Sequence, residues 1–242
     1  MFFKRNSDRP CARAVFVILE RMKKMKKKNL YWIVESALMI AVAIVLEVVS
    51  KTFIPEMPFG GQITAASMMP IILVGWKYGI GRGLVTGLAY SIVEMLIGIK
   101  TVSAVFMPDS DSYLGGLGQA FLMVILDYVV AFTVLGLGAM YKKAFKSATA
   151  SLTLGTFTVI LLRYISHTIS GFILYGAYAE WFFTQEGFYS WGQNIINSFS
   201  GNALAFIYSV IYNGFYMIPE LIITTIVAVF VSRISALTKV KE

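Results

Sequence analysis

Long apolar runs separated by short polar segments follow one another along the chain after residue 30. A helix that crosses a bilayer needs about 20 mainly apolar residues. Five runs meet this requirement, so we expect spanning helices over 31–50, 84–99, 117–141, 152–175 and 203–231. A sixth run, 63–76, is shorter and contains Pro70, which predicts a short or kinked, partly re-entrant second helix. The expected fold class is an all-α integral membrane protein with six transmembrane helices.

Six spans would place the connecting segments alternately on the two sides of the membrane, and most basic residues would then fall on one side. One side would hold residues 1–29, Lys77, Arg82, 142–146, Arg233, Lys239 and Lys241. The other would hold Lys51 and Lys100 as its only basic residues, together with five acidic ones. Cytoplasmic loops are enriched in Lys and Arg, so both termini are predicted to be cytoplasmic. This divides the chain into a basic N-terminal tail (1–29), a six-helix membrane domain (30–235) and a C-terminal tail (236–242).

The composition supports a membrane protein. The chain of 242 residues is 57% hydrophobic and 14% charged, whereas soluble domains are about 45–50% apolar and about 25% charged. The net charge of +8 does not indicate nucleic-acid binding, because ten of the 21 Lys and Arg residues lie before residue 30. With one cysteine, Cys11, and one histidine, we expect neither a disulfide framework nor a metal site.

Seven ionisable residues fall inside the apolar runs, where charge is costly and usually functional. They are Glu35, Glu47, Glu94, Asp127, Arg163, His167 and Glu220. Glu35 and Glu47 lie near the ends of the first run, where they can reach the interface. Glu94 is positioned to face an outer cavity or to pair with Lys100.

Asp127 lies in the middle of a span, next to Tyr128, with no basic neighbour in its own run. An ionised carboxylate there needs a cation, and Arg163 or a cationic ligand would provide one. Arg163 and His167 are four residues apart, so they share one helix face. A structural Asp127–Arg163 pair and a role in ligand binding are compatible: the pair would hold the carboxylate until a ligand arrives. Tyr208 and Asn213 add a phenol and an amide in the outer half of the last run, and an amide suits the edge of a heteroaromatic ring.

The outer connection 178–194, "YAEWFFTQEGFYSWGQN", is rich in aromatic residues. Trp and Tyr favour the headgroup region, so this segment is explained equally well as an interfacial belt or as a lid over an external site.

No pattern indicates an enzyme. The chain has neither a catalytic-triad spacing nor a HExxH motif, and "GIGRG" (79–83) lacks the lysine of a phosphate loop. Active uptake would therefore depend on an ion gradient or on a partner. Ala37 and Ala41 in the first run would allow another helix to approach closely, although they could equally pack within this protein.

Several segments resemble one family, the thiamine-specific S-components of energy-coupling factor (ECF) vitamin transporters. They are "MMPIILVGWKYGIGRGLVTGLAYSIVEMLIG", "GQAFLMVILDYVVAFTVLGLGAMY", "LLRYISHTISGFILYG" and "YSVIYNGF". The resemblance covers about 30–235. It implies six helices, a thiamine site near the outer side and a location in the bacterial cell membrane, with no cofactor. It also implies two kinds of partner that supply ATP hydrolysis, a transmembrane coupling protein and two ATPases.

The resemblance also assigns residues. The acidic–Tyr pair of the family is matched by Asp127 and Tyr128, and its basic residue and histidine by Arg163 and His167. Tyr208 and Asn213 match its Tyr and Asn, and Ala37 and Ala41 match the small residues that contact the coupling protein. The tryptophan that stacks on the pyrimidine falls at Tyr175, and Trp181 or Trp191 in the longer loop could replace it. The family's Trp and Glu before the second span are absent, leaving Gln62 or Thr64 as neutral substitutes.

The leading prediction is thus a thiamine-binding membrane subunit. Three alternatives stay open. The first is an S-component for another heterocycle or a thiamine precursor. The second is a self-sufficient proton-coupled transporter that uses Asp127 or Glu94 as its relay. The third is a structural membrane subunit with a buried salt bridge.

Overall fold

The structure, a computed structural model, describes residues 10–57 and 60–238. Within these ranges every regular element is a helix. Five helical stretches are long and apolar enough to cross a membrane: Asn29–Phe53, Ile80–Ile97, Leu117–Ala139, Ala148–Leu174 and Gly201–Ser232. The all-helical membrane fold expected from the sequence is therefore confirmed, and the five long spans lie where they were predicted, with ends that differ by a few residues.

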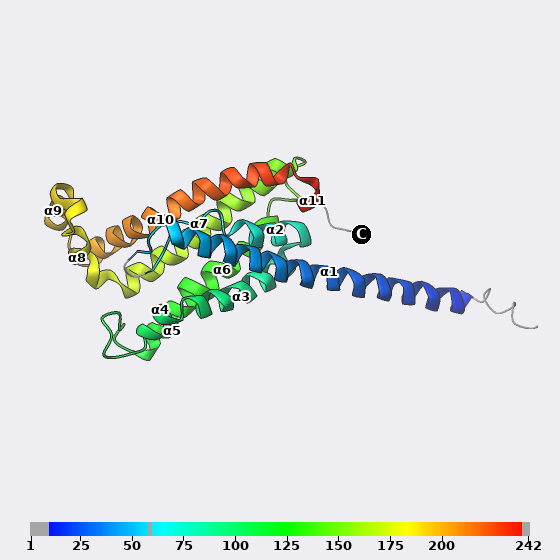
Figure 1. The fold of residues 1–242 in the computed structure, drawn as a ribbon, viewed down its shortest axis with the longest axis horizontal. Helices are drawn as coiled ribbons and strands as arrows, with labels where there is room; N and C mark the ends of the chain where they lie inside the picture. Colours follow the sequence, from blue (N-terminus) through cyan, green and yellow to red (C-terminus); the bar gives the residue numbers. More distant parts are fainter. Residues whose placement is uncertain (1–9, 58–59, 239–242) are drawn as a thin grey trace, which may run out of the picture.

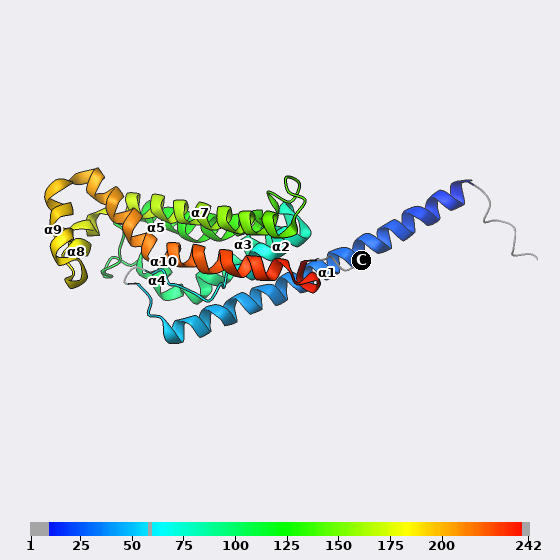
Figure 2. The same cartoon turned by 90° about the horizontal axis from the view of Figure 1, so that it is seen from above.

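The helices form an elongated bundle whose two ends differ (Figure 1). Helix α1 (Pro10–Phe53) runs along the bundle, and its N-terminal half projects beyond it, as Figure 2 also shows. The short helices α8 (Ala179–Phe183) and α9 (Tyr189–Ser198) lie at one end, and α11 (Ser235–Thr238) lies at the other. The outermost parts of the two predicted tails, 1–9 and 239–242, lie outside the described residues.

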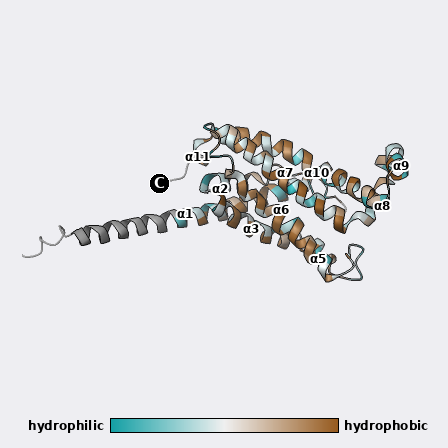
Figure 3. Cartoon of the chain, turned by 180° about the vertical axis from the view of Figure 1, so that it is seen from behind, coloured by the Kyte–Doolittle hydropathy of each residue, from teal (hydrophilic) through white to brown (hydrophobic). Residues whose placement is uncertain are grey.

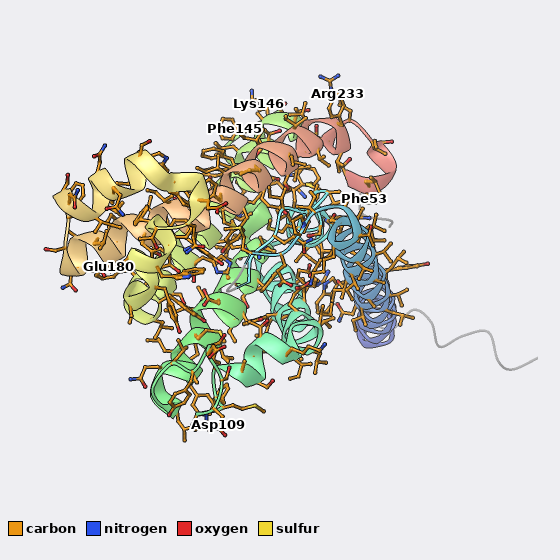
Figure 4. All side chains as sticks on the ribbon, turned by 60° about the vertical axis from the view of Figure 1, so that its left-hand side comes forward. Phe53, Asp109, Phe145, Lys146, Glu180 and Arg233 are labelled. Atoms are coloured by element: carbon orange, nitrogen blue, oxygen red, sulfur yellow. The ribbon has the colours of Figure 1, made fainter. Side chains whose placement is uncertain are left out.

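The charged side chains labelled in Figure 4 are basic near one end of the bundle and acidic near the other. Figure 4 shows Lys146 and Arg233 together at the α11 end, whereas Asp109 and Glu180 lie away from them, in the segments that Figure 1 places at the opposite end. The arrangement matches the alternation of basic and acidic connections along the chain.

Helix α2 (Met69–Tyr78) is shorter than the predicted second span, 63–76. Pro70 does not bend it but lies in its first turn, where a proline needs no hydrogen-bond partner and its fixed φ favours helix initiation. Residues 63–68 are irregular, and Ala66 has a positive φ of 58°. Of the two predicted alternatives, a short or a kinked second helix, the structure has the short one, with Pro70 at its start and not at a bend.

Helix α3 (Ile80–Ile97) follows α2 after one residue, Gly79, whose φ of +93° favours glycine. It is followed by α4 (Ile99–Ala104). A Cβ added to Gly83 would lie 2.2 Å from the carbonyl oxygen of Gly136 and 2.5 Å from the Cα of Gly75. These glycines bring α2, α3 and the fourth span into backbone contact.

The fourth span is not one regular helix. It consists of α5 (Leu117–Met123), the π-helical segment η1 (Val124–Val130), α6 (Ala131–Thr133) and the 3₁₀ segment η2 (Val134–Ala139). Asp127 and Tyr128 lie within η1. Wide π-helical turns are frequent at functional sites, and here one turn carries the mid-span carboxylate.

The two longest spans are α7 (Ala148–Leu174) and α10 (Gly201–Ser232), and they pack against each other. The Ser147 hydroxyl caps α7 by accepting a hydrogen bond from the backbone N–H of Ala150, at 3.3 Å. Pro219 lies inside α10. Between them, η3 (Gly176–Tyr178), α8, η4 (Glu186–Phe188) and α9 form the outer connection.

Large apolar side chains cover the outside of all five spans, for example Leu38, Leu96, Phe121, Ile173 and Phe230. Figure 3 shows hydrophobic residues along the length of α7 and α10. Buried polar residues, in contrast, gather between the helices. The bundle therefore presents an apolar exterior to lipid and holds its polar groups inside.

Candidate ligand-binding site

A cavity of about 150 Å³ lies between α1, α3, the fourth span, α7 and α10. Seven residues selected from the sequence line it: Asp127, Tyr128, Arg163, His167, Tyr175, Tyr208 and Asn213. Trp181 and Trp191 are not among its lining residues and are 43% and 42% exposed. The structure thus gathers the predicted polar groups in one place and leaves the two tryptophans outside it. That these residues bind a ligand stays a prediction.

The carboxylate of Asp127 is held by two donors on α7. Its Oδ1 lies 2.8 Å from Nδ1 of His167, and its Oδ2 accepts a hydrogen bond of 2.6 Å from the Ser170 hydroxyl. The wide π-helical turn thereby joins two spans through a carboxylate that still borders the cavity. Ser170 was not predicted to belong to the site. It lies one turn beyond His167, and its spacing from Arg163 and His167 places all three on one helix face, which is the signal for it in the sequence.

The predicted direct pair of Arg163 with Asp127 does not form, because His167 lies between the two residues. The Nε–H of Arg163 donates to Nε2 of His167 at 3.2 Å. Because Nε2 accepts this bond, the proton of a neutral imidazole lies on Nδ1, which then donates to Asp127. The arginine therefore acts on the carboxylate through the imidazole, since both groups on α7 occupy one face.

The guanidinium of Arg163 makes two further contacts. Its carbon lies 4.3 Å from the centre of the Phe132 ring, and its Nη1 lies 2.7 Å from the sulfur of Met68. An arginine over an aromatic face is stabilised by a cation–π interaction, which strengthens away from water. Neither Phe132 nor Met68 was singled out from the sequence, because apolar residues in a span carry no signal of their own.

Asn213 is engaged within the protein. Its amide nitrogen donates to the carbonyl oxygens of His167 and Ser209, at 3.2 and 2.9 Å, and its oxygen accepts a hydrogen bond of 2.6 Å from Tyr216. It fixes α10 to the turn of α7 that carries His167. Tyr208 is only 1% exposed and packs against the rings of Phe182 and Tyr212.

Tyr175 lies just beyond the end of α7 and lines the cavity. Burial raises the pKa of its phenol above the ordinary value, with Asp127 as a further cause, so the side chain is neutral. A neutral, largely buried phenol presents an aromatic face and can donate a hydrogen bond.

Five acidic residues line the cavity, against two basic ones. The acids are Glu47, Glu56, Glu94, Asp127 and Glu220, and the basic residues are Lys51 and Arg163. Glu47 and Glu94 were candidates because they interrupt apolar runs, and their inclusion in the same cavity as Asp127 is a structural finding. Glu94 faces this cavity, one of the two positions considered for it. Glu35 instead pairs with Lys77 and Tyr78.

Glu220 and the loop after α1 close one side of the cavity. The carboxylate of Glu220 accepts hydrogen bonds from both the backbone N–H and the hydroxyl of Thr64. Gln62 donates to the carbonyl oxygen of Ile54 at 2.7 Å. Both loop residues line the cavity as neutral groups, and both are held by the protein's own contacts.

The outer connection packs on the residues of the cavity through its aromatic rings. Phe182 lies 5.3 Å from Tyr208 and 5.6 Å from Tyr212, centre to centre, and Phe188 lies 5.2 Å from Trp191. The segment therefore covers two cavity-lining tyrosines. Its explanations as an interfacial belt and as a lid both remain predictions.

Ala37 and Ala41 lie on the exposed face of α1, whereas Ser36 and Ala43 on the opposite face are buried. The alternative that the two alanines pack within this chain is therefore wrong for the structure described. Their contact with a coupling protein stays a prediction.

Comparisons with known proteins agree on one family. The model of the thiamine transporter protein family (Thia_YuaJ) matches residues 33–108 and 113–205. Thiamine transporter ThiT of Bacillus subtilis (strain 168) is 31% identical over 211 residues, which cover 84% of this chain and 90% of that protein. A structure of ThiT from Listeria monocytogenes covers 86% of this chain and 97% of its own, with a TM-score of 0.58 and 20% identity. This last likeness concerns the fold.

Proposed function

Because the chain belongs to the thiamine transporter protein family, and is thus a multi-pass protein of the cell membrane, we propose that it is a thiamine-binding subunit of an ECF importer. In this proposal the chain captures thiamine from outside. A transmembrane coupling protein and two ATPases supply the energy. The family is one of transporters and not of enzymes.

The observation that carries the proposal is the acidic, aromatic cavity around Asp127. Thiamine combines a permanently positive thiazolium with a flat aminopyrimidine. A carboxylate in a low-dielectric site attracts such a cation much more strongly than it would in water. The faces of Tyr128 and Tyr175, which line the cavity, would add cation–π attraction of roughly 2 kcal/mol when water is excluded.

Arg163 and His167 support this role by position. The guanidinium of Arg163 is occupied by Phe132, Met68 and His167, so in the proposal it holds the imidazole and leaves the carboxylate of Asp127 to face the ligand. His167 and Asn213 would border the aminopyrimidine. These roles of Arg163 and His167 would explain why a membrane span contains an arginine and a histidine.

For the topology, we propose six membrane-inserted helices, the five long spans and the short α2, with both termini in the cytoplasm. The basic residues Lys146 and Arg233 would then face the cytoplasm, and Asp109 and Glu180 the outside. The cavity would open on the outer side, beneath α8 and α9. In the same proposal, the exposed Ala37 and Ala41 on α1 form the surface for the coupling protein.

Isothermal titration of the purified protein tests the proposed substrate. Thiamine should bind tightly, and a neutral pyrimidine that lacks the thiazolium should bind much more weakly. Equal binding of both would show that the substrate is a pyrimidine precursor. Uptake by this protein alone in liposomes, driven by a pH gradient without partner subunits or ATP, would replace the ECF proposal with a proton-coupled transporter.

A further inference from the structure

One buried acid of the cavity has no role in the proposal above. Glu94 on α3 is 7% exposed and lines the same cavity as Asp127. Its Oε1 atom is buried and has no hydrogen-bond partner among the residues that the structure describes. A buried carboxyl oxygen without a partner is unfavourable, so Oε1 calls for a donor or a cation in addition to the Glu47 and Tyr90 side chains that lie against the carboxyl group.

A second acid lies against it. The carboxyl group of Glu47 on α1 is within hydrogen-bonding reach of that of Glu94, and it is also buried, at 8% exposed. Its Oε1 lies 2.9 Å from Nζ of Lys51. Lys51 compensates the charge of Glu47 alone, so a second ionised carboxylate in contact with Glu47 away from water would carry an uncompensated negative charge. The pair therefore holds a proton between its two members.

Tyr128 connects this acidic pair to Asp127. Gly98 lies one turn beyond Glu94, and a Cβ built on it would lie 2.7 Å from the hydroxyl oxygen of Tyr128. The ring of Tyr128 is therefore an aromatic wall that begins at the turn of Asp127 and ends at the turn that follows Glu94. A flat cation against this ring would have a carboxyl group at either end of it.

Six charged or titratable groups interact with the pair, directly or through Lys51 and Tyr128. They are Lys51 on α1, Glu56 in the loop after it, Tyr90 on α3, Asp127 and Tyr128 on η1, and Arg163 on α7. Lys51 is committed to Glu47, and Arg163 to His167 and the ring of Phe132. No basic side chain among them is therefore bound to the free oxygen of Glu94.

We propose that Glu94, together with Glu47, is a cation-recognising element of this site, and that the positively charged ring of the ligand replaces the proton that the two carboxyl groups share. The proton leaves to the solvent as the cation enters, so one positive charge takes the place of another. This inference rests on the proposed function, because it requires a cationic ligand in the cavity. It makes Glu94 a specificity-determining residue that separates cationic heterocycles from neutral ones.

Isothermal titration with thiamine near neutral pH, in several buffers that differ in ionisation enthalpy, tests this exchange. The wild-type protein should release up to one proton per bound thiamine. Glu94→Gln should abolish the release and raise the Kd for thiamine roughly tenfold or more. It should leave the Kd for the neutral pyrimidine unchanged. Gln keeps the shape and a hydrogen bond to Glu47, so the unliganded variant should keep its thermal midpoint.

Two further variants complete the test. Glu186→Gln makes the same change of charge on an exposed residue of η4, and it should preserve both proton release and affinity. Glu47→Gln breaks the pair from the other side and should also abolish the release, which keeps the test valid if Glu94→Gln does not fold. Proton release or affinity that is unchanged in Glu94→Gln would overturn the inference while the proposed function stands. A wild-type protein that does not bind thiamine would overturn both.

Discussion

The Nδ1 atom of His167 lies 2.8 Å from the Oδ1 atom of Asp127, which joins α7 to the π-helical turn of the fourth span. The contact gives the mid-span carboxylate a hydrogen-bond donor without neutralising it, because the imidazole is neutral when its other nitrogen accepts from Arg163. The carboxylate of Asp127 can therefore remain at the cavity wall and still have hydrogen-bond partners when no ligand is bound. This combination separates a binding carboxylate from a purely structural salt bridge.

Asp127→Asn should weaken thiamine binding by roughly 10- to 100-fold, since a charge-assisted contact is lost. The neutral pyrimidine should lose much less affinity, because it has no positive charge to attract. Titration calorimetry with both ligands measures the two changes. An equal loss for both would assign Asp127 to the shape of the cavity and not to recognition of charge.

Gly83→Ala should lower the thermal midpoint of the protein. The added Cβ would lie 2.2 Å from the Gly136 oxygen, a contact that only a separation of α3 from the fourth span can relieve. We expect a cost of about 1–3 kcal/mol. Gly81→Ala is the matched control on the same helix, because its Cβ would meet nothing within 4 Å. There alanine should leave the stability unchanged or raise it by up to about 1 kcal/mol.

The positions of the long spans could be predicted because length and apolar content are local properties of a sequence. The type of helix within a span could not be predicted in this way. The pattern from 117 to 139 is a mainly apolar run that Asp127 interrupts, yet the backbone passes from α-helix to π-helix, back to a short α-helical turn and then to 3₁₀-helix. The same span also lies so close to α3 that Gly83 and Gly136 meet backbone to backbone. Such contacts between residues far apart in the chain are contained in no window of the sequence.

The members of the cavity were easier to predict than their partners. A charged residue in an apolar run is conspicuous, which is why Asp127, Arg163 and Glu94 were candidates before the structure. Which of them meet depends on the rotation and height of each helix. His167 therefore takes the place of Arg163 as the partner of Asp127. Glu94 faces the cavity, as one of its two predicted positions required, and lies against Glu47 instead of Lys100.

Tyr175→Ala should weaken thiamine binding roughly tenfold, whereas Trp181→Ala and Trp191→Ala should change it less than about twofold. Tyr175 lines the cavity, and loss of an aromatic face near a desolvated cation costs about 1–2 kcal/mol. The two tryptophans do not line the cavity, so their removal takes no contact from the ligand. Equilibrium titration of the three variants decides which aromatic residue performs the stacking role. A large effect of Trp191→Ala would instead support closure of the outer connection over the ligand.

Ala41→Trp should block thiamine uptake in the presence of the coupling protein and the ATPases, while thiamine binding by the isolated protein stays unchanged. Ala41 is exposed on α1 and contributes no atom to the cavity, so a larger side chain affects only a helix that approaches from outside. Val42→Trp is the matched control. Val42 is also exposed, and its side chain points about 100° away around the same helix.

The two measurements are uptake by the reconstituted complex and titration of the isolated subunit. If Ala41→Trp and Val42→Trp impair uptake equally, the small residues have no special role and α1 meets its partner through another face. If neither variant impairs uptake, the coupling protein does not dock on this part of α1. Selective loss in Ala41→Trp, with binding intact, would assign the Ala37–Ala41 face to assembly, because small residues allow two helix backbones to approach closely in a membrane without a hydrophobic driving force.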